Sequence, residues 1–158
     1  MSDGRMFDTM ADAVRFITAG KATVTLVSKK TGTRFTFKVQ VPKDAPDAER
    51  ASAPKFVKVL TGSDNETAYA FLGTLFPPNE RFPKAAFRIS QKARISPDAP
   101  SARAARWLFE AIAEGRDVTD VCEIWHEGKC GWCGKKLTVP SSIAAGYGPD
   151  CLGYVGLK

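Results

Sequence analysis

The chain has 158 residues, of which 44% are hydrophobic and 25% are charged, an ordinary composition for a globular protein with one core of medium size. Lysine and arginine number 23 against 17 aspartate and glutamate residues, which gives a net charge of +6 and a pI near 9.3. No apolar run approaches the roughly 18 residues that cross a bilayer, and the first residues lack the apolar segment of a secretion signal. These features exclude the collagen, coiled-coil and wholly disordered classes, and we expect a cytoplasmic protein without membrane contact.

The first 76 residues predict one helix and two hairpins. Apolar side chains at positions 10, 13, 14 and 17 recur at helical spacing over residues 8–18, where Asp8 or Thr9 can cap the start and Gly20 follows the end. Residues 22–41 alternate apolar and polar side chains on both sides of a turn, which predicts a hairpin with one core face and one basic face. Residues 42–54 predict a loop without a core-forming pattern. Residues 56–60 and 67–76 predict a second hairpin with its turn at 62–65.

The second hairpin contains side chains with two open interpretations. Tyr69, Phe71 and Phe76 fall within or just after its second strand. They can pack in the core and across strands, or they can form a platform on which nucleic-acid bases stack. Asp64 and Glu66 in the turn could hold Mg²⁺, although aspartate and asparagine have ordinary structural roles in turns.

The fold class expected from these elements is α+β. Residues 77–100 are interrupted by proline, and residues 101–114 then predict a second helix with Ser101 as a cap and Gly115 at its end. We expect an antiparallel sheet of about four strands with two helices in residues 1–118, followed by a C-terminal module in residues 119–158.

Positive charge is concentrated between positions 81 and 106. Seven basic residues and one acidic residue, Asp98, lie there, so this segment carries an excess equal to that of the whole chain. Phe82, Phe87 and Trp107 are interleaved with these charges. Cations with aromatic rings between them suit a phosphate backbone and unstacked bases, although a basic loop is often simply solvated. The candidate nucleic-acid contacts in this segment are Arg88, Lys92, Arg94, Arg103 and Arg106.

The cysteines carry the clearest chemical signal. Cys130, Cys133 and Cys151 lie within the last 30 residues, and Cys122 lies just upstream. Cytoplasmic thiols stay reduced, which disfavours a disulfide framework. Two residues between Cys130 and Cys133 allow a tight turn to direct both sulfurs at one ion about 2.3 Å away. A redox pair of the thioredoxin kind shares this spacing but needs a βαβ context that the sequence does not show. The spacing therefore predicts a structural Zn²⁺ site.

His126 is the predicted fourth ligand, which completes the pattern His-x3-Cys-x2-Cys-x17-Cys. If residues 121–125 form a strand, Cys122 shares a face with His126. Cys122 could then be a buried apolar thiol, or it could replace His126 as a ligand. A turn directly between His126 and the first knuckle cysteine favours the histidine.

A closed site of three cysteines and one histidine is structural, because catalytic zinc needs an open position and a nearby base. With the single histidine used for the metal, no Ser-His-Asp set is available. The sequence also lacks both Gly-rich nucleotide-binding motifs, GxxxxGKS and GxGxxG. We therefore expect a protein that is not an enzyme.

The segment from His126 to Cys151 resembles a small zinc-binding domain of unknown function that is found in bacteriophage and prophage proteins. The shared pattern is Cys-Gly-x-Cys-Gly-x-x-Leu-Thr-x-Pro-x-Ser-Ile-x-x-Gly-x-Gly-Pro-x-Cys, and the chain follows it from Cys130 to Cys151. The resemblance covers about one sixth of the chain, and residues 59–65 also look like phage proteins that carry this module. It implies zinc binding and a phage origin, and the module's presence on phage helicase-like proteins favours nucleic acid.

Together these features predict a phage-type accessory protein of the host cytoplasm that binds DNA or RNA with low sequence specificity. Besides the basic residues named above, Trp132 and Lys135 at the rim of the knuckle are candidate contacts. The alternative is a protein-interaction module that inhibits or redirects a host protein, because a surface fixed by a metal is pre-organised for either role. Nucleic-acid binding would weaken steeply with salt, which separates the two.

Overall fold

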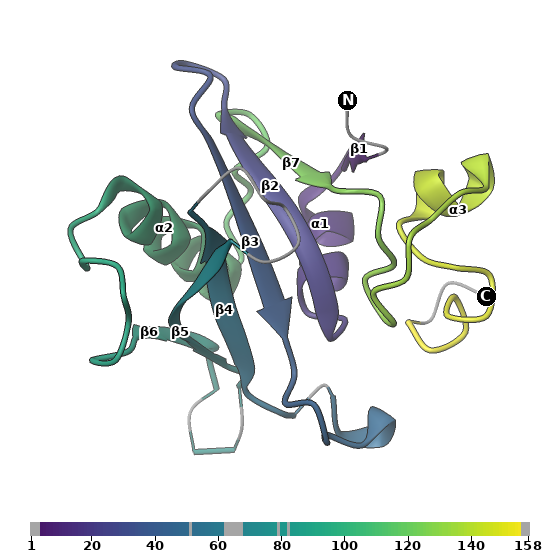
Figure 1. Cartoon of the computed structure of the whole chain (residues 1–158), viewed down its shortest axis with the longest axis horizontal. Coiled ribbons are helices and arrows are strands. Elements are labelled where there is room, and N and C mark those ends of the chain that lie inside the picture. The colour runs from purple at the N-terminus through teal and green to yellow at the C-terminus, as the bar shows by residue number, and fades with distance from the viewer. Residues whose placement is uncertain (1–3, 51, 62–67, 79, 82, 156–158) are drawn as a thin grey trace.

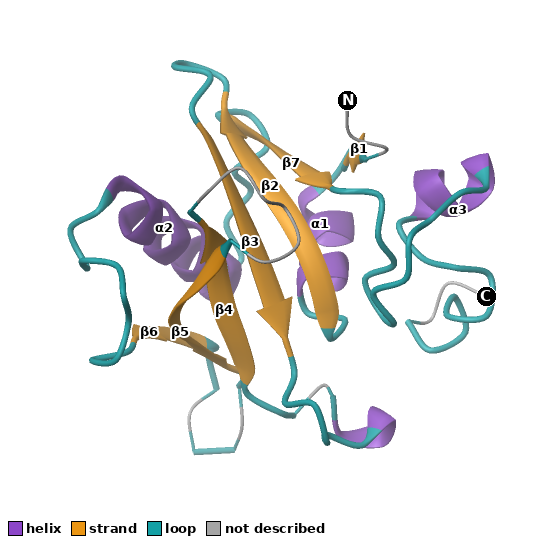
Figure 2. Cartoon of the chain, in the orientation of Figure 1, coloured by secondary structure: helices purple, strands orange, loops and turns teal. Residues whose placement is uncertain are grey.

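One antiparallel sheet organises the protein (Figure 1). The computed structural model describes residues 4–50, 52–61, 68–78, 80–81 and 83–155. Within them, seven strands follow the order β1-β7-β2-β3-β4-β5-β6. The strands are β1 (Arg5–Met6), β2 (Lys21–Ser28), β3 (Arg34–Gln40), β4 (Lys55–Leu60), β5 (Tyr69–Phe76), β6 (Ala86–Ile89) and β7 (Cys122–His126). The helices are α1 (Met10–Ile17), α2 (Pro100–Glu114) and α3 (Pro140–Ala145), with a 3-10 turn η1 (Asp47–Glu49) (Figure 2).

The sheet is larger than the four strands expected. Both predicted hairpins are confirmed as β2–β3 and β4–β5, while the predicted turn at 62–65 lies outside the described residues. The additional strands are short, with two, four and five residues. These short segments become strands by pairing with distant neighbours: β6 with β5, and β7 with β1 and β2. Of the three, β7 overlaps the strand considered at 121–125, and its side chains alternate between buried and half-buried.

The position of β7 ties the C-terminal segment to the rest of the chain. The expected boundary at 118/119 falls just before β7, which pairs with β2 from Val24↔His126 to Ser28↔Cys122. Residues 122–126 are therefore part of the main sheet, and the knuckle follows directly from one of its strands.

One face of the sheet carries the core and both long helices. A row of paired residues crosses the strands from His126 through Val24 and Phe37 to Val59, and each of these side chains is buried. Side chains of α1 and α2 belong to the same core. The opposite face, which we call the far face, is also covered at its centre, where Thr25 is fully buried and its hydroxyl bonds that of Thr36 at 2.7 Å.

The helix ends follow their local sequence. Thr9 caps α1 by accepting a hydrogen bond from the backbone N–H of Asp12 at 3.2 Å. Helix α2 begins with Pro100 rather than being capped by Ser101, because proline suits the first turn, where its missing N–H has no partner to lose. Gly115 ends α2 in a left-handed conformation with φ of 70°. None of the described helices is long and apolar enough to cross a membrane.

Candidate metal centre

Three sulfur atoms gather at the C-terminal end of the chain. The Sγ atoms of Cys130, Cys133 and Cys151 all lie within 4.8 Å of one another. Sulfur ligands of a tetrahedral zinc ion are about 3.8 Å apart, since each Zn–S bond is about 2.3 Å long. Small side-chain rotations would therefore bring all three sulfurs onto one ion. The cluster could hold a metal ion, as the cysteine spacing predicted.

Local backbone hydrogen bonds bring these cysteines together. The N–H of Cys130 donates to the carbonyl of Lys135, and the N–H of Gly134 donates to the carbonyl of Cys130, both at 2.8 Å. Gly134 has a φ of 79°, a backbone conformation that favours glycine, so the turn depends on this residue. Cys151 arrives on the loop after α3, with its N–H donating to the carbonyl of Gly148 at 3.0 Å.

The surroundings of the sulfurs shift the pKa values of Cys130 and Cys151 in opposite directions. Burial alone would raise the pKa of the Cys130 thiol, but backbone hydrogen bonds from Cys133, Gly148 and Trp132 bring its pKa below the ordinary value. Burial, together with the two neighbouring sulfurs, raises the pKa of Cys151 to about 12. A divalent ion bound here would supply positive charge that favours the deprotonated form of the sulfurs.

The knuckle is seated directly on the core. A Cβ atom built on Gly131 would lie 2.7 Å from the ring of Phe16 in α1 and 3.2 Å from the ring of Tyr147. The N–H of Gly131 donates to the carbonyl of Gly146 at 3.1 Å, and its carbonyl accepts from the N–H of Lys21 at 2.9 Å. The cysteine cluster is therefore fixed to β2 and α1 as well as to its own turn.

His126 does not join the cysteine cluster. The group of described side chains that could hold a metal ion contains the three cysteines alone, and both nitrogens of the buried His126 ring are engaged elsewhere. Nδ1 accepts from the N–H of Gly128 at 3.0 Å, so Nε2 carries the proton and donates to the carbonyl of Ile143 at 2.6 Å. Burial lowers the pKa of His126, which favours this neutral form. The structure thus gives the predicted fourth ligand a different role, as a bridge between β7 and α3.

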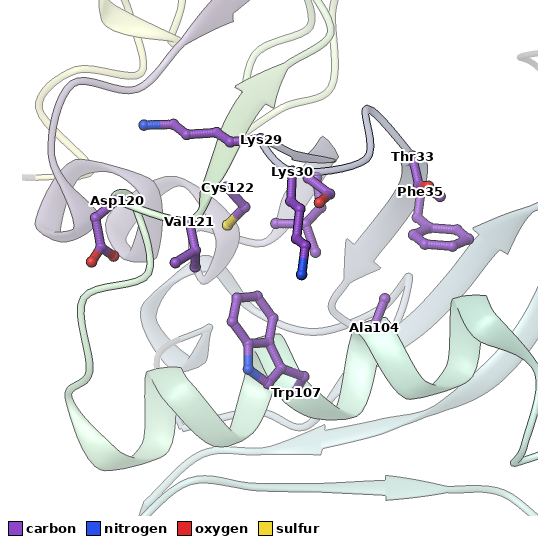
Figure 3. A pocket seen from close by; sticks show the side chains of 11 residues that line it. Lys29, Lys30, Thr33, Phe35, Ala104, Trp107, Asp120, Val121 and Cys122 are labelled. Atoms are coloured by element: carbon purple, nitrogen blue, oxygen red, sulfur yellow. The ribbon is translucent and has the colours of Figure 1, made fainter.

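Cys122, the alternative ligand, lies at the other end of β7. Its sulfur donates to the carbonyl of Val118 at 3.2 Å, and burial raises its pKa to about 11. It lines an apolar cavity of about 590 Å³. Figure 3 shows Trp107 of α2 across this cavity from the Cys122 sulfur, with the Lys30 side chain extending toward the Trp107 ring. In this arrangement Cys122 is a buried thiol, the first of the two roles considered for it from the sequence, and Trp107 lines the same cavity.

The Trp132 ring packs between side chains of the protein itself. Its ring stacks on Tyr154 with centroids 4.9 Å apart and an interplanar angle of 4°, and the Arg50 guanidinium lies 4.0 Å from its centroid. Arg50 also donates to the carbonyls of Ala19 and Trp132, and it pairs with Asp47. Arg50 is not predictable as a functional residue from the sequence, because it lies in the loop at 42–54 that has no core-forming pattern. Only the fold places this buried arginine beside the knuckle.

The predicted basic contacts fall into two groups at opposite ends of the sheet (Figure 1). One group surrounds β6, and we call it the basic belt. Arg88 points to the far face from β6, two residues lie in the following loop, and two lie on the outer side of α2. All five are exposed, and none pairs with an acidic residue in the described part of the chain. The members of the basic belt are Arg88, Lys92, Arg94, Arg103 and Arg106.

The second group, Lys135 and Trp132, lies beyond β7. Five strand spacings of about 4.8 Å separate β7 from β6, which is about 24 Å. Of the aromatic side chains interleaved with the belt, Phe87 packs on Phe109 with ring centroids 4.9 Å apart, and Phe82 lies outside the described residues. The charges predicted together therefore do not form one surface.

Comparison with known proteins identifies the C-terminal segment alone. Residues 125–156 match the model of a family of unknown function, DUF6011. This segment contains the three cysteines of the cluster and the knuckle turn. No curated protein and no solved structure matches the chain.

Proposed function

We propose that Cys130, Cys133 and Cys151 hold one Zn²⁺ ion with a structural role. The proximity of three sulfurs carries this proposal, because thiolates favour zinc over the hard cations Mg²⁺ and Ca²⁺. Bound zinc would supply a cross-link between the knuckle and the loop after α3. In the arrangement described here, no further side chain of the described residues supplies a fourth ligand.

Elemental analysis of the purified protein tests the zinc proposal. We expect about one zinc per chain, and we expect Cys130→Ser to lose both the metal and the order of the C-terminal segment. Cys122→Ser is the matched control, since this cysteine lies outside the cluster, and it should keep the metal. Full zinc content in Cys130→Ser would contradict the proposal.

We further propose that the protein binds nucleic acid through the basic belt, as an accessory protein of phage type. The exposure of five cations without an acidic partner among the described residues supports this proposal. If all five contact phosphates, the logarithm of the affinity should fall with the logarithm of salt concentration with a slope of about −3.5 for single strands. The phage origin rests on the sequence resemblance.

Fluorescence anisotropy with a labelled oligonucleotide, titrated at several salt concentrations, tests this function. The double variant Arg103→Gln/Arg106→Gln should weaken binding and reduce the salt slope by about 1.4. Arg116→Gln is the matched control, because Arg116 lies just after α2 and is already paired with Glu114 at 2.7 Å. Absence of binding at low salt would refute this function and favour the protein-interaction alternative.

A further inference from the structure

The far face of the sheet carries an aromatic and basic patch at its β4–β5–β6 end. Strand pairing sets Phe56, Thr74 and Arg88 in one row across the three strands. Phe76 lies two residues beyond Thr74 on β5, so its side chain projects from the same face. Helix α2 covers the other face here, where Phe87 of β6 packs on it. The patch therefore faces away from the core.

The two phenylalanines of this patch are exposed large hydrophobic residues that lie outside the buried core. Phe56 is 39% exposed and Phe76 is 41% exposed. Phe71 meets Phe56 edge to face, with centroids 6.1 Å apart and planes at 74°, which holds the Phe56 ring in place. Thr74, which lies opposite Phe56 and two residues before Phe76 on β5, is small. Rings exposed around a small residue form a surface on which other planar groups can stack.

A hollow beside this surface is rimmed by cations. It has a volume of about 620 Å³ and extends from Phe76 over Pro77 and Pro83 to the side chains of Lys84 and Arg88. The lining that the structure describes contains no acidic side chain. An apolar surface beside two positive charges suits a ligand that combines a planar ring with a negatively charged group. A nucleotide has this combination in its base and its phosphate.

We propose that single-stranded nucleic acid binds at this patch, with bases stacked on Phe56 and Phe76 and phosphates paired with Lys84 and Arg88. The proposal rests on the nucleic-acid function above and gives it a strand type and a location. A duplex keeps its bases stacked on one another, whereas a single strand can offer them to protein rings. From Arg88 the strand backbone can continue around the β6 edge to the rest of the basic belt.

The need for the Phe56 and Phe76 rings distinguishes this proposal from a purely electrostatic attraction between the basic residues and the oligonucleotide. In anisotropy titrations with a labelled 20-nucleotide oligo-dT, Phe56→Leu/Phe76→Leu should lower affinity by about 5- to 150-fold for each stacked base lost. The salt slope should stay unchanged, because leucine removes no cation. Tyr154→Leu is the control, because this exposed aromatic residue lies at the metal end of the protein, and it should bind as the wild type does.

Arg88→Gln gives a second test that does not depend on the phenylalanines. It should weaken binding and reduce the salt slope by about 0.7. Unchanged single-strand affinity in the phenylalanine double variant would refute the patch, and if the Arg103→Gln/Arg106→Gln variant still weakens binding, the general function stands. Preference of the wild type for duplex would also refute the patch. Binding of a poly-glutamate peptide as tight as that of oligo-dT, unaffected by the phenylalanine changes, would refute it too. Absence of any oligonucleotide binding at low salt would overturn both proposals.

Discussion

Replacing His126 by phenylalanine tests the role that the structure gives to this histidine. The change removes both ring nitrogens but keeps a planar ring in contact with Phe7 and Phe16, whose centroids lie 5.7 and 5.6 Å from that of the histidine. Two backbone groups lose their partner: the N–H of Gly128, hydrogen-bonded at 3.0 Å, and the carbonyl of Ile143, at 2.6 Å. The variant therefore isolates hydrogen bonding from packing.

The expected loss of stability follows from these two groups. Leaving a buried polar group without a partner costs about 1 to 3 kcal/mol. Gly128 is buried and Ile143 is half-buried, so we expect a loss of about 3 kcal/mol in the free energy of unfolding. For a chain of 158 residues, this corresponds to a fall in Tm of about 6 to 12 °C. Calorimetry and urea unfolding measure both quantities.

Metal content separates the bridging role from the ligand role. If His126 bridges β7 and α3, His126→Phe should unfold at lower temperature yet keep about one zinc per chain, as measured at a temperature where it is folded. The absorption spectrum of its Co²⁺-loaded form should match that of the Co²⁺-loaded wild type, because the sulfur ligands are unchanged. Loss of the metal to the same extent as in Cys130→Ser would refute the bridge and restore His126 as the fourth ligand.

The remaining predictions concern contacts around the knuckle and the opposite end of β7. Gly131→Ala should lower the free energy of unfolding by about 1 to 3 kcal/mol, because its Cβ would lie 2.7 Å from the Phe16 ring, whereas Gly148→Ala, with no atom within 4 Å of the new Cβ, should not. Arg50→Met should loosen the knuckle, seen as faster amide exchange there, since it removes bonds to two backbone carbonyls. Burial raises the Cys122 pKa from 9.0 to about 11, so the folded state binds the thiol proton more tightly than the unfolded state does. The stabilisation that this protonated thiol gives to the folded state is fully present below pH 9 and is lost as pH rises through about 11. Urea unfolding at pH 8 and pH 11 should show a smaller decline for Cys122→Val than for the wild type.

The parts of this protein that depend on neighbours in sequence were predictable from the sequence. The knuckle needs two cysteines separated by two residues and a glycine that can adopt a positive φ, and Cys130, Cys133 and Gly134 supply them within one turn. The β2–β3 hairpin and the Thr9 cap of α1 likewise follow from alternation and from a local hydrogen bond. Each of these features is formed by interactions over a few residues, which the order of amino acids specifies directly.

Tertiary structure alone decided the features that depend on distant partners. The His126 ring lies against the carbonyl of Ile143, 17 residues away, and Arg50 reaches Trp132 from 82 residues upstream. No local pattern encodes such pairs, because packing of the sheet and helices sets which groups meet. For the same reason, side chains that the chain spaces far apart, such as Phe56 and Arg88, share one row of the sheet, while Lys135 lies at the opposite end from the basic belt it was predicted to join. The sequence thus specifies which chemical groups are present and their short-range geometry, and the strand order determines which of them can act together.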